Sequence, residues 1–221
     1  MRKTKIVCTL GPSSSDEKTL RAMLEAGMNV ARLNFSHGTH EGHGKTIDLF
    51  RKVRDELGVP AAVLLDTKGP EIRTGNFVRG EEILKDGQKF TLTTREVEGT
   101  TEIVSVTYKD LPKEVQKDNL ILINDGKIVI RVEETTDTDV AGVVVHGGKI
   151  SNHKGINLPN VNLHMEYLSP QDKEDILFGI KKDVDYIAAS FVRSAGDVFA
   201  IRSLLEENGG NEIKIIAKIE S

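Results

Sequence analysis

The first third of the chain alternates short apolar runs with longer segments in which apolar residues recur at helical spacing. Three apolar runs predict strands, at Lys5–Leu10, Met28–Leu33 and Ala62–Leu65. Two segments between them predict helices, at residues 17–26 and His40–Leu57, and each is followed by a glycine of the kind that ends helices. Strands that alternate with helices in this way predict parallel pairing through helical crossovers.

From Gly75 to Leu163 the helical spacing gives way to alternating or β-rich segments separated by glycine and aspartate turns. Asn124–Lys127 is a strong hairpin signal, because Asp-Gly stands between two apolar runs. The only stretch with a helical pattern is Leu111–Lys117. We therefore predict an all-β module, a small barrel, inserted after the third strand. The Asn- and Gly-rich segment Ser151–Leu163 leads out of it as a linker would.

Helical spacing resumes at Ser169-Pro170, where an N-cap residue precedes proline at the first helical position. Fourth and fifth strands are predicted at Asp185–Phe191 and Glu212–Ile219, with a helix over Ala195–Asn208 between them. Five strands in roughly 125 residues make about half of a closed (β/α)8 barrel of roughly 250 residues, although an open five-stranded sheet is an alternative. Because Lys218–Glu220 does not resemble a natural C-terminus, we expect a truncated chain.

The predicted fold class is therefore α/β, a partial (β/α)8 TIM barrel with its first five parallel strands and an inserted all-β barrel domain. The predicted boundaries are 1–69 for the first barrel segment, 70–166 for the inserted domain and 167–221 for the second, truncated barrel segment.

Composition and charge narrow the class of protein. Hydrophobic residues make up 38% and charged residues 29% of the chain, as in ordinary soluble domains. The net charge of −4 comes from 30 basic and 34 acidic residues that are well mixed, which argues against a nucleic-acid or membrane-surface partner. The single cysteine, Cys8, cannot form an internal disulfide and fits a reducing cytosol. No stretch approaches a membrane span or a signal sequence, so we expect a cytoplasmic protein.

Polar residues follow the predicted strands at their carboxyl ends, the edge at which parallel α/β folds bind ligands. They are Arg32, Asn34, Ser36, His37, Asp66, Thr67, Lys68, Ser190, Arg193, Lys218 and Glu220. The set combines cations, carboxylates and hard oxygen donors, which suits a phosphorylated anionic substrate with oxygen-preferring metal ions. Cysteine and histidine are too sparse here for a zinc site.

Each of these residues alone has a structural explanation. Arg32 could form a surface ion pair, and Asn34 and Ser36 could be turn or cap residues. His37 lies near two further histidines, which could suggest a metal site but fits a solvated loop better. Asp66 could simply pair with a neighbouring lysine. Only the joint pattern favours an active site.

Six motifs carry a resemblance to a known family: VARLNFSHG, LLDTKGPEIRTG, NDGKI, KGINLP, IAASFVR and IIAKIE. In this order they closely resemble pyruvate kinase, from Lys5 to the last residue, and LLDTKGPEIRTG alone is highly specific. The family transfers phosphate from phosphoenolpyruvate to ADP in glycolysis, giving pyruvate and ATP, with Mg²⁺ or Mn²⁺ and usually K⁺. The resemblance also implies a (β/α)8 barrel with a β-barrel lid inserted after the third strand, a further C-terminal domain and a homotetrameric parent enzyme.

The resemblance implies roles for individual residues. Arg32 would grip the substrate phosphate, and Lys218 would stabilise the charge that develops on the transferring phosphoryl group and the enolate. Glu71 stands where a glutamate accompanies dependence on K⁺. The ion ligands would be Asn34, Ser36, Asp66 and Thr67 for K⁺ and Glu220 for Mg²⁺. Contacts to ADP or ATP would come from Asn34, His37, Arg73, Asp125 and Lys154.

The chain departs from the family pattern in the stretch NLHMEYLSPQDKED and at Ser221, where Asn is common. The family's second metal-binding carboxylate and a substrate-contacting threonine lie beyond Ser221, so we expect the chain to be inactive alone. One alternative is a non-catalytic binding or assembly module, in which the half-barrel pairs with a second copy through its open edges. Another phosphoenolpyruvate- or pyruvate-handling barrel, such as an aldolase or synthase, is disfavoured by the inserted lid and by DTKGPEIRTG.

Overall fold

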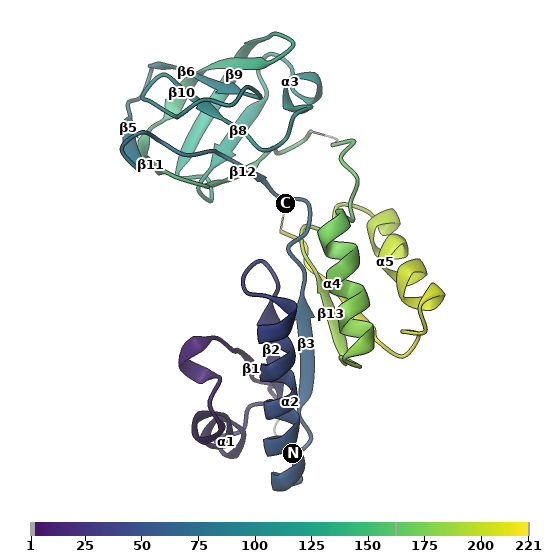
Figure 1. Ribbon diagram of the computed structural model, residues 1–221. Helices are drawn as coiled ribbons and strands as arrows, with labels where there is room; N and C mark the ends of the chain where they lie inside the picture. The colour runs from purple at the N-terminus through teal and green to yellow at the C-terminus, as the bar shows by residue number, and fades with distance from the viewer. Residues whose placement is uncertain (1–2, 162, 221) are drawn as a thin grey trace. The chain divides into compact units, whose positions relative to one another are not determined.

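The computed structural model describes residues 3–161 and 163–220 and divides them into two compact units (Figure 1). The sheet unit comprises the residues up to Pro70 together with Glu166–Glu220. The β unit comprises Glu71–Met165. Ser221, at which the sequence departs from the pyruvate kinase pattern, lies outside the described residues.

The sheet unit is built on a parallel sheet with the order β1-β2-β3-β13-β14. Its strands are β1 (Val7–Thr9), β2 (Val30–Asn34), β3 (Ala62–Asp66), β13 (Tyr186–Ala189) and β14 (Lys214–Ala217). The helices are α1 (Glu17–Glu25), α2 (His40–Leu57), α4 (Pro170–Lys181) and α5 (Ala195–Glu207), with a short 3-10 helix at Pro12–Ser14. The predicted α/β class, with five parallel strands consistent with part of a barrel, is confirmed.

Local sequence explains where the helices begin. The side chain of Asp16 accepts a hydrogen bond from the Thr19 backbone at the start of α1, and Thr39 caps α2 in the same way. Ser169 and Asp172 form a reciprocal capping box at the start of α4. These caps satisfy backbone N–H groups that the first turn of a helix leaves unpaired.

Apolar and polar side chains alternate along β2, so the apolar core and the candidate site lie on opposite faces of the sheet. Ala31 and Leu33 of β2 are buried among apolar side chains of α1, α2, α4 and α5. Arg32 and Asn34, between and after them, therefore lie on the opposite face of the sheet. The same strand thus anchors the helices and presents polar groups on its other side.

The last two strands are shorter than predicted. β13 ends at Ala189 and β14 at Ala217, because their ladder runs only from Tyr186 opposite Lys214 to Ala189 opposite Ala217. The prediction that strand structure extends to Ile219 is therefore wrong. One further backbone hydrogen bond, from Lys218 N to Ala189 O at 3.0 Å, still holds Lys218 at the strand end.

The β unit contains a seven-stranded sheet with the order β4-β12-β8-β9-β10-β6-β7 and a two-stranded sheet, β11-β5. Its strands are β4 (Ile72–Arg73), β5 (Glu81–Leu84), β6 (Lys89–Thr93), β7 (Ile103–Ser105), β8 (Leu120–Ile123), β9 (Ile128–Thr135), β10 (Asp139–His146), β11 (Gly148–Ser151) and β12 (Gly155–Asn157). A bridge between Thr74 and Val106 joins the ends of β4 and β7, so the seven-stranded sheet closes on itself.

Two local predictions within the β unit can be compared with the structure. The Asn124–Lys127 hairpin is confirmed, since β8 and β9 pair antiparallel with Ile123 opposite Ile128. Its turn places Asn124 and Asp125 both at φ 56°, a left-handed conformation that Asn and Asp tolerate. The predicted helix forms as α3, but it covers only Leu111–Glu114. No helix among residues 3–161 and 163–220 is long and apolar enough to cross a membrane.

Candidate active site

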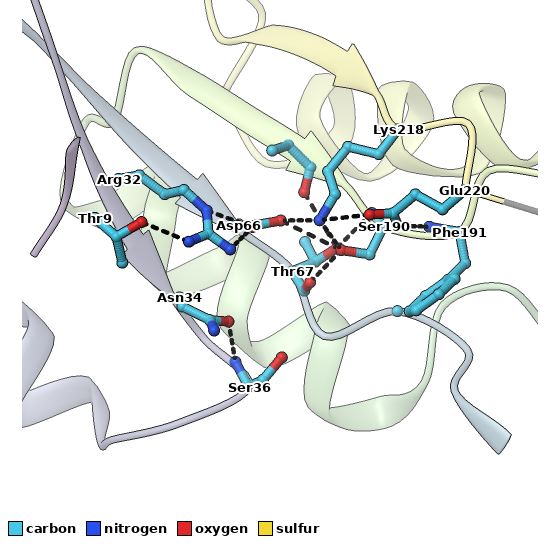
Figure 2. Close-up of polar contacts among 12 residues, drawn as sticks. Thr9, Arg32, Asn34, Ser36, Asp66, Thr67, Ser190, Phe191, Lys218 and Glu220 are labelled. Carbon is cyan, nitrogen blue, oxygen red and sulfur yellow. Dashed lines mark hydrogen bonds and ion pairs between the residues drawn. The ribbon is translucent and has the colours of Figure 1, made fainter. Parts of the chain in front are cut away.

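A buried carboxylate at the end of β3 is the centre of the candidate site (Figure 2). The side chain of Asp66 is only 3% exposed, yet it contacts two cations. Arg32 Nε donates to Asp66 Oδ2 at 2.7 Å, and Lys218 Nζ donates to Asp66 Oδ1 at 2.9 Å. A buried charge is costly unless it is paired and hydrogen-bonded, and both oxygens of Asp66 meet this condition.

Arg32 reaches Asp66 because β2 and β3 are neighbours. The register places Arg32 opposite Leu64 and Asn34 opposite Asp66, so the guanidinium extends along the strand toward the carboxylate. Its Nη1 also donates to Thr9 Oγ1 on β1 at 2.6 Å. A guanidinium has five N–H donors, and these contacts leave others for an incoming anion. The Arg32 side chain is 30% exposed, so such an anion can reach it.

Ser190 follows β13 and connects the two strands on either side. Its hydroxyl lies 2.6 Å from the carbonyl oxygen of Thr67 and 3.2 Å from Asp66 Oδ1. Lys218 Nζ donates to the same hydroxyl at 2.9 Å. The carboxyl ends of β3, β13 and β14 are thus joined by one hydrogen-bond network, as Figure 2 shows.

Glu220 lies beside this network. Its Oε1 is 3.4 Å from Lys218 Nζ, and its Oε2 accepts a hydrogen bond from the backbone N–H of Phe191 at 3.0 Å. The Glu220 side chain is 36% exposed. The two predicted residues at the end of β14 therefore meet, although both lie beyond the strand itself.

The remaining predicted residues of the sheet unit lie on the loop after β2. Asn34 Oδ1 accepts a hydrogen bond from the Ser36 backbone at 3.1 Å, which fixes the turn. His37 is exposed, and its carbonyl oxygen is 2.7 Å from His43 Nε2. Asn34 is brought next to Asp66 by strand register, whereas His37 shares no side-chain contact with the Asp66 network.

Three predicted nucleotide contacts fall in the β unit, where they gather near one another. Arg73 on β4 pairs with Gly155 of β12, directly after Lys154. Asp125 lies in the β8–β9 turn, where the Asn124 backbone donates to Gly155 O at 3.0 Å. The hydrogen bonds that Arg73 donates to the Glu71 carboxylate raise the pKa of Arg73 above its usual value against the opposing effect of burial, and the Asp125 charge adds to this increase. Lys154, Arg73 and Asp125 therefore share one region of this unit.

Donor chemistry indicates which ions these residues suit. Asn34, Ser36, Asp66 and Thr67 offer only oxygen atoms, the ligand type that hard cations prefer. Carboxylate and carbonyl oxygens each have more than one acceptor position, so the contacts of Asp66 and Thr67 leave capacity for an ion. Within the described ranges, no cluster of three His, Cys, Asp or Glu side chains could hold a metal ion. Glu220 thus offers a single carboxylate, which is enough for Mg²⁺ only when substrate oxygens and water complete its shell.

The charges of its residues identify this site. A cavity of about 580 Å³ opens at the amino ends of the strands, lined by residues that include Lys5, Asn29, Ala62, Asp185 and Tyr186. It contains none of the predicted site residues. The carboxyl ends of the same strands hold the network of cations and carboxylates.

Sequence reasoning missed two supporting contacts near the site. Tyr167 is buried, and its hydroxyl donates to the carbonyl oxygen of Ser190 at 2.8 Å. Asp172, at the start of α4, accepts a hydrogen bond from the Gly69 backbone at 3.0 Å. The S-x-x-D capping pattern could have indicated a buried role for Asp172, whereas no sequence pattern points to Tyr167.

A third missed contact involves the histidines after β2. His40 Nε2 is 2.6 Å from Oδ1 of Asp175, a carboxylate that is 2% exposed on α4. The His40 ring stacks on Phe178, and the His43 ring stacks on Phe35. These histidines are therefore partners in the packing between α2 and α4. The metal site that was considered for them is not supported within the described part of the chain.

The parallel sheet with charged carboxyl ends, whose chain is interrupted by a closed β unit, is consistent with part of an α/β barrel fold. The family described as pyruvate kinase, barrel domain, matches residues 1–221. The chain belongs to the pyruvate kinase family.

Curated relatives agree with this assignment. The chain is 49% identical to the pyruvate kinase of Staphylococcus haemolyticus over 223 residues, 48% to that of Geobacillus stearothermophilus and 46% to that of Clostridium acetobutylicum. Each comparison covers 100% of this chain. The chain spans 38% of the first two relatives and 47% of the third, which is less than half of their length.

Proposed function

We propose that this chain is the N-terminal part of a pyruvate kinase, which transfers a phosphoryl group from phosphoenolpyruvate to ADP. The observation that supports this most strongly is the pairing of Arg32 and Lys218 with one buried carboxylate, Asp66. Phosphoryl transfer asks a protein mainly for positioning and charge neutralisation. Two fixed cations at the carboxyl ends of parallel strands meet that demand.

Arg32 would bind the phosphate of phosphoenolpyruvate. Asp66 and Thr9 hold its guanidinium from two sides, so its position is set before the substrate arrives. The remaining N–H donors suit a phosphate, because guanidinium groups bind its oxygens in pairs. Fixing the donors in advance lowers the cost of ordering them on binding.

Lys218 would stabilise the negative charge that shifts onto the transferring group and the enolate oxygen. Two of its three ammonium donors are held by Asp66 and Ser190 at 2.9 Å. The third faces Glu220 at the longer distance of 3.4 Å. We expect the substrate to replace this longer contact with Glu220. The two shorter contacts keep the ammonium fixed, and a fixed cation stabilises developing charge without reorganisation.

The oxygen donors are proposed to hold ions. Asn34, Ser36, Asp66 and Thr67 would hold K⁺, and Glu220 would be one ligand of Mg²⁺ or Mn²⁺. When bound, these ions would neutralise phosphate charge and orient its oxygens. Glu71, which forms two hydrogen bonds with Arg73 at 2.7 and 2.8 Å, would accompany dependence on K⁺.

The β unit would act as the lid that meets the nucleotide. Arg73, Asp125 and Lys154 gather around β4 and β12, and His37 with Asn34 would contact the nucleotide from the sheet unit. A lid that excludes water strengthens the electrostatic interactions beneath it. The family's glycolytic role further supports a cytoplasmic enzyme, and we propose a homotetrameric parent.

A chimera tests this function. Residues 1–221 would replace the matching part of the Clostridium acetobutylicum relative, and pyruvate formation from phosphoenolpyruvate and ADP would be followed with lactate dehydrogenase in Mg²⁺ and K⁺. We expect the chimera to turn over within about tenfold of the intact Clostridium acetobutylicum relative, which corresponds to a difference of about 1.4 kcal/mol in the activation free energy. A folded chimera without turnover would contradict the proposal. The 221-residue chain alone should show no turnover near that of the intact relative.

A second candidate role, self-association, is favoured by the edges of the sheet. β1 and β14 are the outermost strands of this sheet, and Val7 and Ile216 on them are 52% and 41% exposed. Exposed apolar edge strands can pair with a second chain. Light scattering on the 221-residue chain distinguishes the cases, because a strictly monomeric mass would exclude this role.

A further inference from the structure

Ser190 lies at the centre of the site, and nothing in the proposed reaction assigns it a task. Ser190 is only 3% exposed. The shortest contact of its hydroxyl, 2.6 Å, is to the Thr67 carbonyl, so the hydroxyl proton is directed there. The oxygen can then accept from the Lys218 ammonium at 2.9 Å. One hydroxyl thus orients Lys218 relative to the backbone after β3.

Ser190 lies close to the segment that leads into the β unit and is hydrogen-bonded to the segment that leads out of it. The first crossing leaves the sheet unit at Gly69-Pro70, and a Cβ at Gly69 would lie 2.9 Å from both the Cβ and the carbonyl oxygen of Ser190. The second crossing returns at Glu166, and the adjacent Tyr167 donates its hydroxyl to the Ser190 carbonyl oxygen. Gly69 has φ 72°, so it has neither the space nor the conformation for a side chain.

We propose that Ser190 is a positioning residue, which fixes the Lys218 ammonium through its hydroxyl and connects it to the returning chain crossing through the hydrogen bond between its carbonyl oxygen and Tyr167. This inference rests on the proposed function for the catalytic meaning of Lys218. The hydroxyl supplies one of the three acceptors of the ammonium (Figure 2). Hydrogen bonds from Tyr167 to the carbonyl oxygen and from the Ser190 backbone N–H to Thr67 hold the serine itself in place. A displacement of Tyr167 would therefore move the group that orients Lys218.

Packing alone does not explain the choice of serine. Alanine would fill nearly the same volume, but it would remove the acceptor for Lys218 and leave the Thr67 carbonyl without this donor. The backbone N–H of Ser190 also donates to Thr67 Oγ1 at 3.2 Å, so the two residues hold each other through two hydrogen bonds. A hydrogen bond to a charged group contributes more than one between neutral groups. Serine therefore contributes mainly to orientation.

Chemical labelling of lysines tests the inference without any substrate. The 221-residue chain would be treated briefly with trinitrobenzenesulfonate, and the modification of Lys218 relative to Lys214 would be measured by peptide mass spectrometry. Lys214 is exposed at the other end of β14 and serves as an internal control for the amount of reagent and the labelling time, and circular dichroism checks that each variant is folded. In Ser190→Ala we expect the Lys218 to Lys214 ratio to rise roughly tenfold. An unchanged ratio in folded Ser190→Ala would overturn the proposal.

Tyr167→Phe provides a second variant that keeps the aromatic ring and removes only the hydrogen bond to the Ser190 carbonyl. We expect a smaller rise in the ratio, roughly twofold to threefold. If Ser190→Ala does not fold, this variant decides the matter, and an unchanged ratio in it would overturn the proposal. Ser203→Ala, at an exposed serine on α5, should leave the ratio unchanged.

The test separates this inference from the proposed function. A raised ratio together with an inactive chimera would support the positioning of Lys218 by Ser190 and contradict the proposed reaction. An active chimera together with an unchanged ratio would support the proposed reaction and contradict the positioning of Lys218 by Ser190. In an active chimera, Ser190→Ala should lower kcat more than it raises KM, because it disturbs Lys218 and leaves the Arg32 contacts in place.

Discussion

Lys218 Nζ lies 2.9 Å from Asp66 Oδ1, although the two residues are 152 positions apart in the chain. The β unit and most of two helical crossovers separate them in sequence. They meet because β3 and β14 both pair with β13, which brings their carboxyl ends to one edge of the sheet. The candidate site therefore depends on the parallel order of these three strands.

Removal of the charge on Asp66 should destabilise the protein. In Asp66→Asn, Arg32 and Lys218 would lose their shared carboxylate at a position that is almost fully buried. Breaking a buried ion pair typically lowers the free energy of unfolding by about 3–5 kcal/mol. Because both cations are about a third exposed, we expect a smaller loss of about 2 kcal/mol. Urea unfolding followed by circular dichroism measures this change.

A matched control uses an exposed ion pair in the same unit. Asp48 pairs with Lys182, and its side chain is 63% exposed. Asp48→Asn should cost less than about 1 kcal/mol. Equal losses for the two variants would show that the Asp66 network has no special role in stability.

Substitution of Arg32 by lysine should weaken substrate binding more than it slows turnover. A lysine keeps the charge but cannot contact Asp66, Thr9 and a phosphate at the same time with a planar fork. In the chimera we expect KM for phosphoenolpyruvate to rise by about tenfold to a hundredfold. Steady-state kinetics measure it, and Arg21→Lys, at an ion pair between α1 and α2, is the control. A KM unchanged by Arg32→Lys would contradict the assigned role.

Much of this site could be predicted from the sequence, because strand ends are visible in the pattern of residues. Apolar runs followed directly by Asp66 or by Ser190 mark where strands stop, and parallel pairing brings such ends together. Periodicity alone does not say which strands are neighbours, so the order β3-β13-β14 was predicted only through the barrel fold, in which consecutive strands pair. The hydrogen bonds of Ser190 to Thr67 and Lys218 depend on that order.

Acid should destabilise the β unit in a way that depends on Glu114. Burial raises the pKa of this carboxyl, but hydrogen bonds from His164 and Tyr108 outweigh burial and leave the pKa below its usual value of 4.5. A lowered pKa gives stability that is present above pH 4.5 and is lost as the pH falls through the folded-state value. Glu114→Gln should therefore be less stable at neutral pH and lose less stability below pH 4.5.

Thermal unfolding at pH values above and below 4.5 measures how much Glu114 contributes to stability. Glu133→Gln, at an exposed position on β9, serves as a control for the loss of one negative charge. Parallel acid profiles for the wild-type chain and Glu114→Gln would contradict the prediction.

Alkali should affect the sheet unit through Tyr167. Burial, together with the negative charges of Asp197 and Asp172, raises the pKa of its hydroxyl well above the usual 10.0. The unfolded chain then loses this proton before the folded chain does, so the contribution is present below pH 10.0 and declines as the pH rises above it. Tyr167→Phe should show a flatter loss of stability above pH 10.0.

Ultraviolet absorbance of phenolate gives the direct measurement for Tyr167. The chain has three tyrosines, and we expect one of them to titrate later than the others in the wild type. That late step should be missing in Tyr167→Phe. A late step that persists in this variant would assign the raised pKa to another tyrosine.

The packing between α2 and α4 shows a second limit of sequence reasoning. His37, His40 and His43 lie within seven residues, a spacing that invited comparison with a metal site. In the structure His40 pairs with Asp175, which is 135 residues away, and His43 stacks on Phe35. A histidine satisfied by a distant carboxylate has no signature in local spacing, so its role became visible only in the fold.

The most direct test of the central claim is the turnover of the chimera when Lys218 is replaced by methionine. Methionine keeps a long flexible side chain and removes the charge that faces Asp66 and Ser190. We predict that kcat falls by about a thousandfold or more, while the folded chimera retains its circular dichroism spectrum. Turnover within tenfold of the unsubstituted chimera would contradict the account of Lys218 as the cation that stabilises phosphoryl transfer.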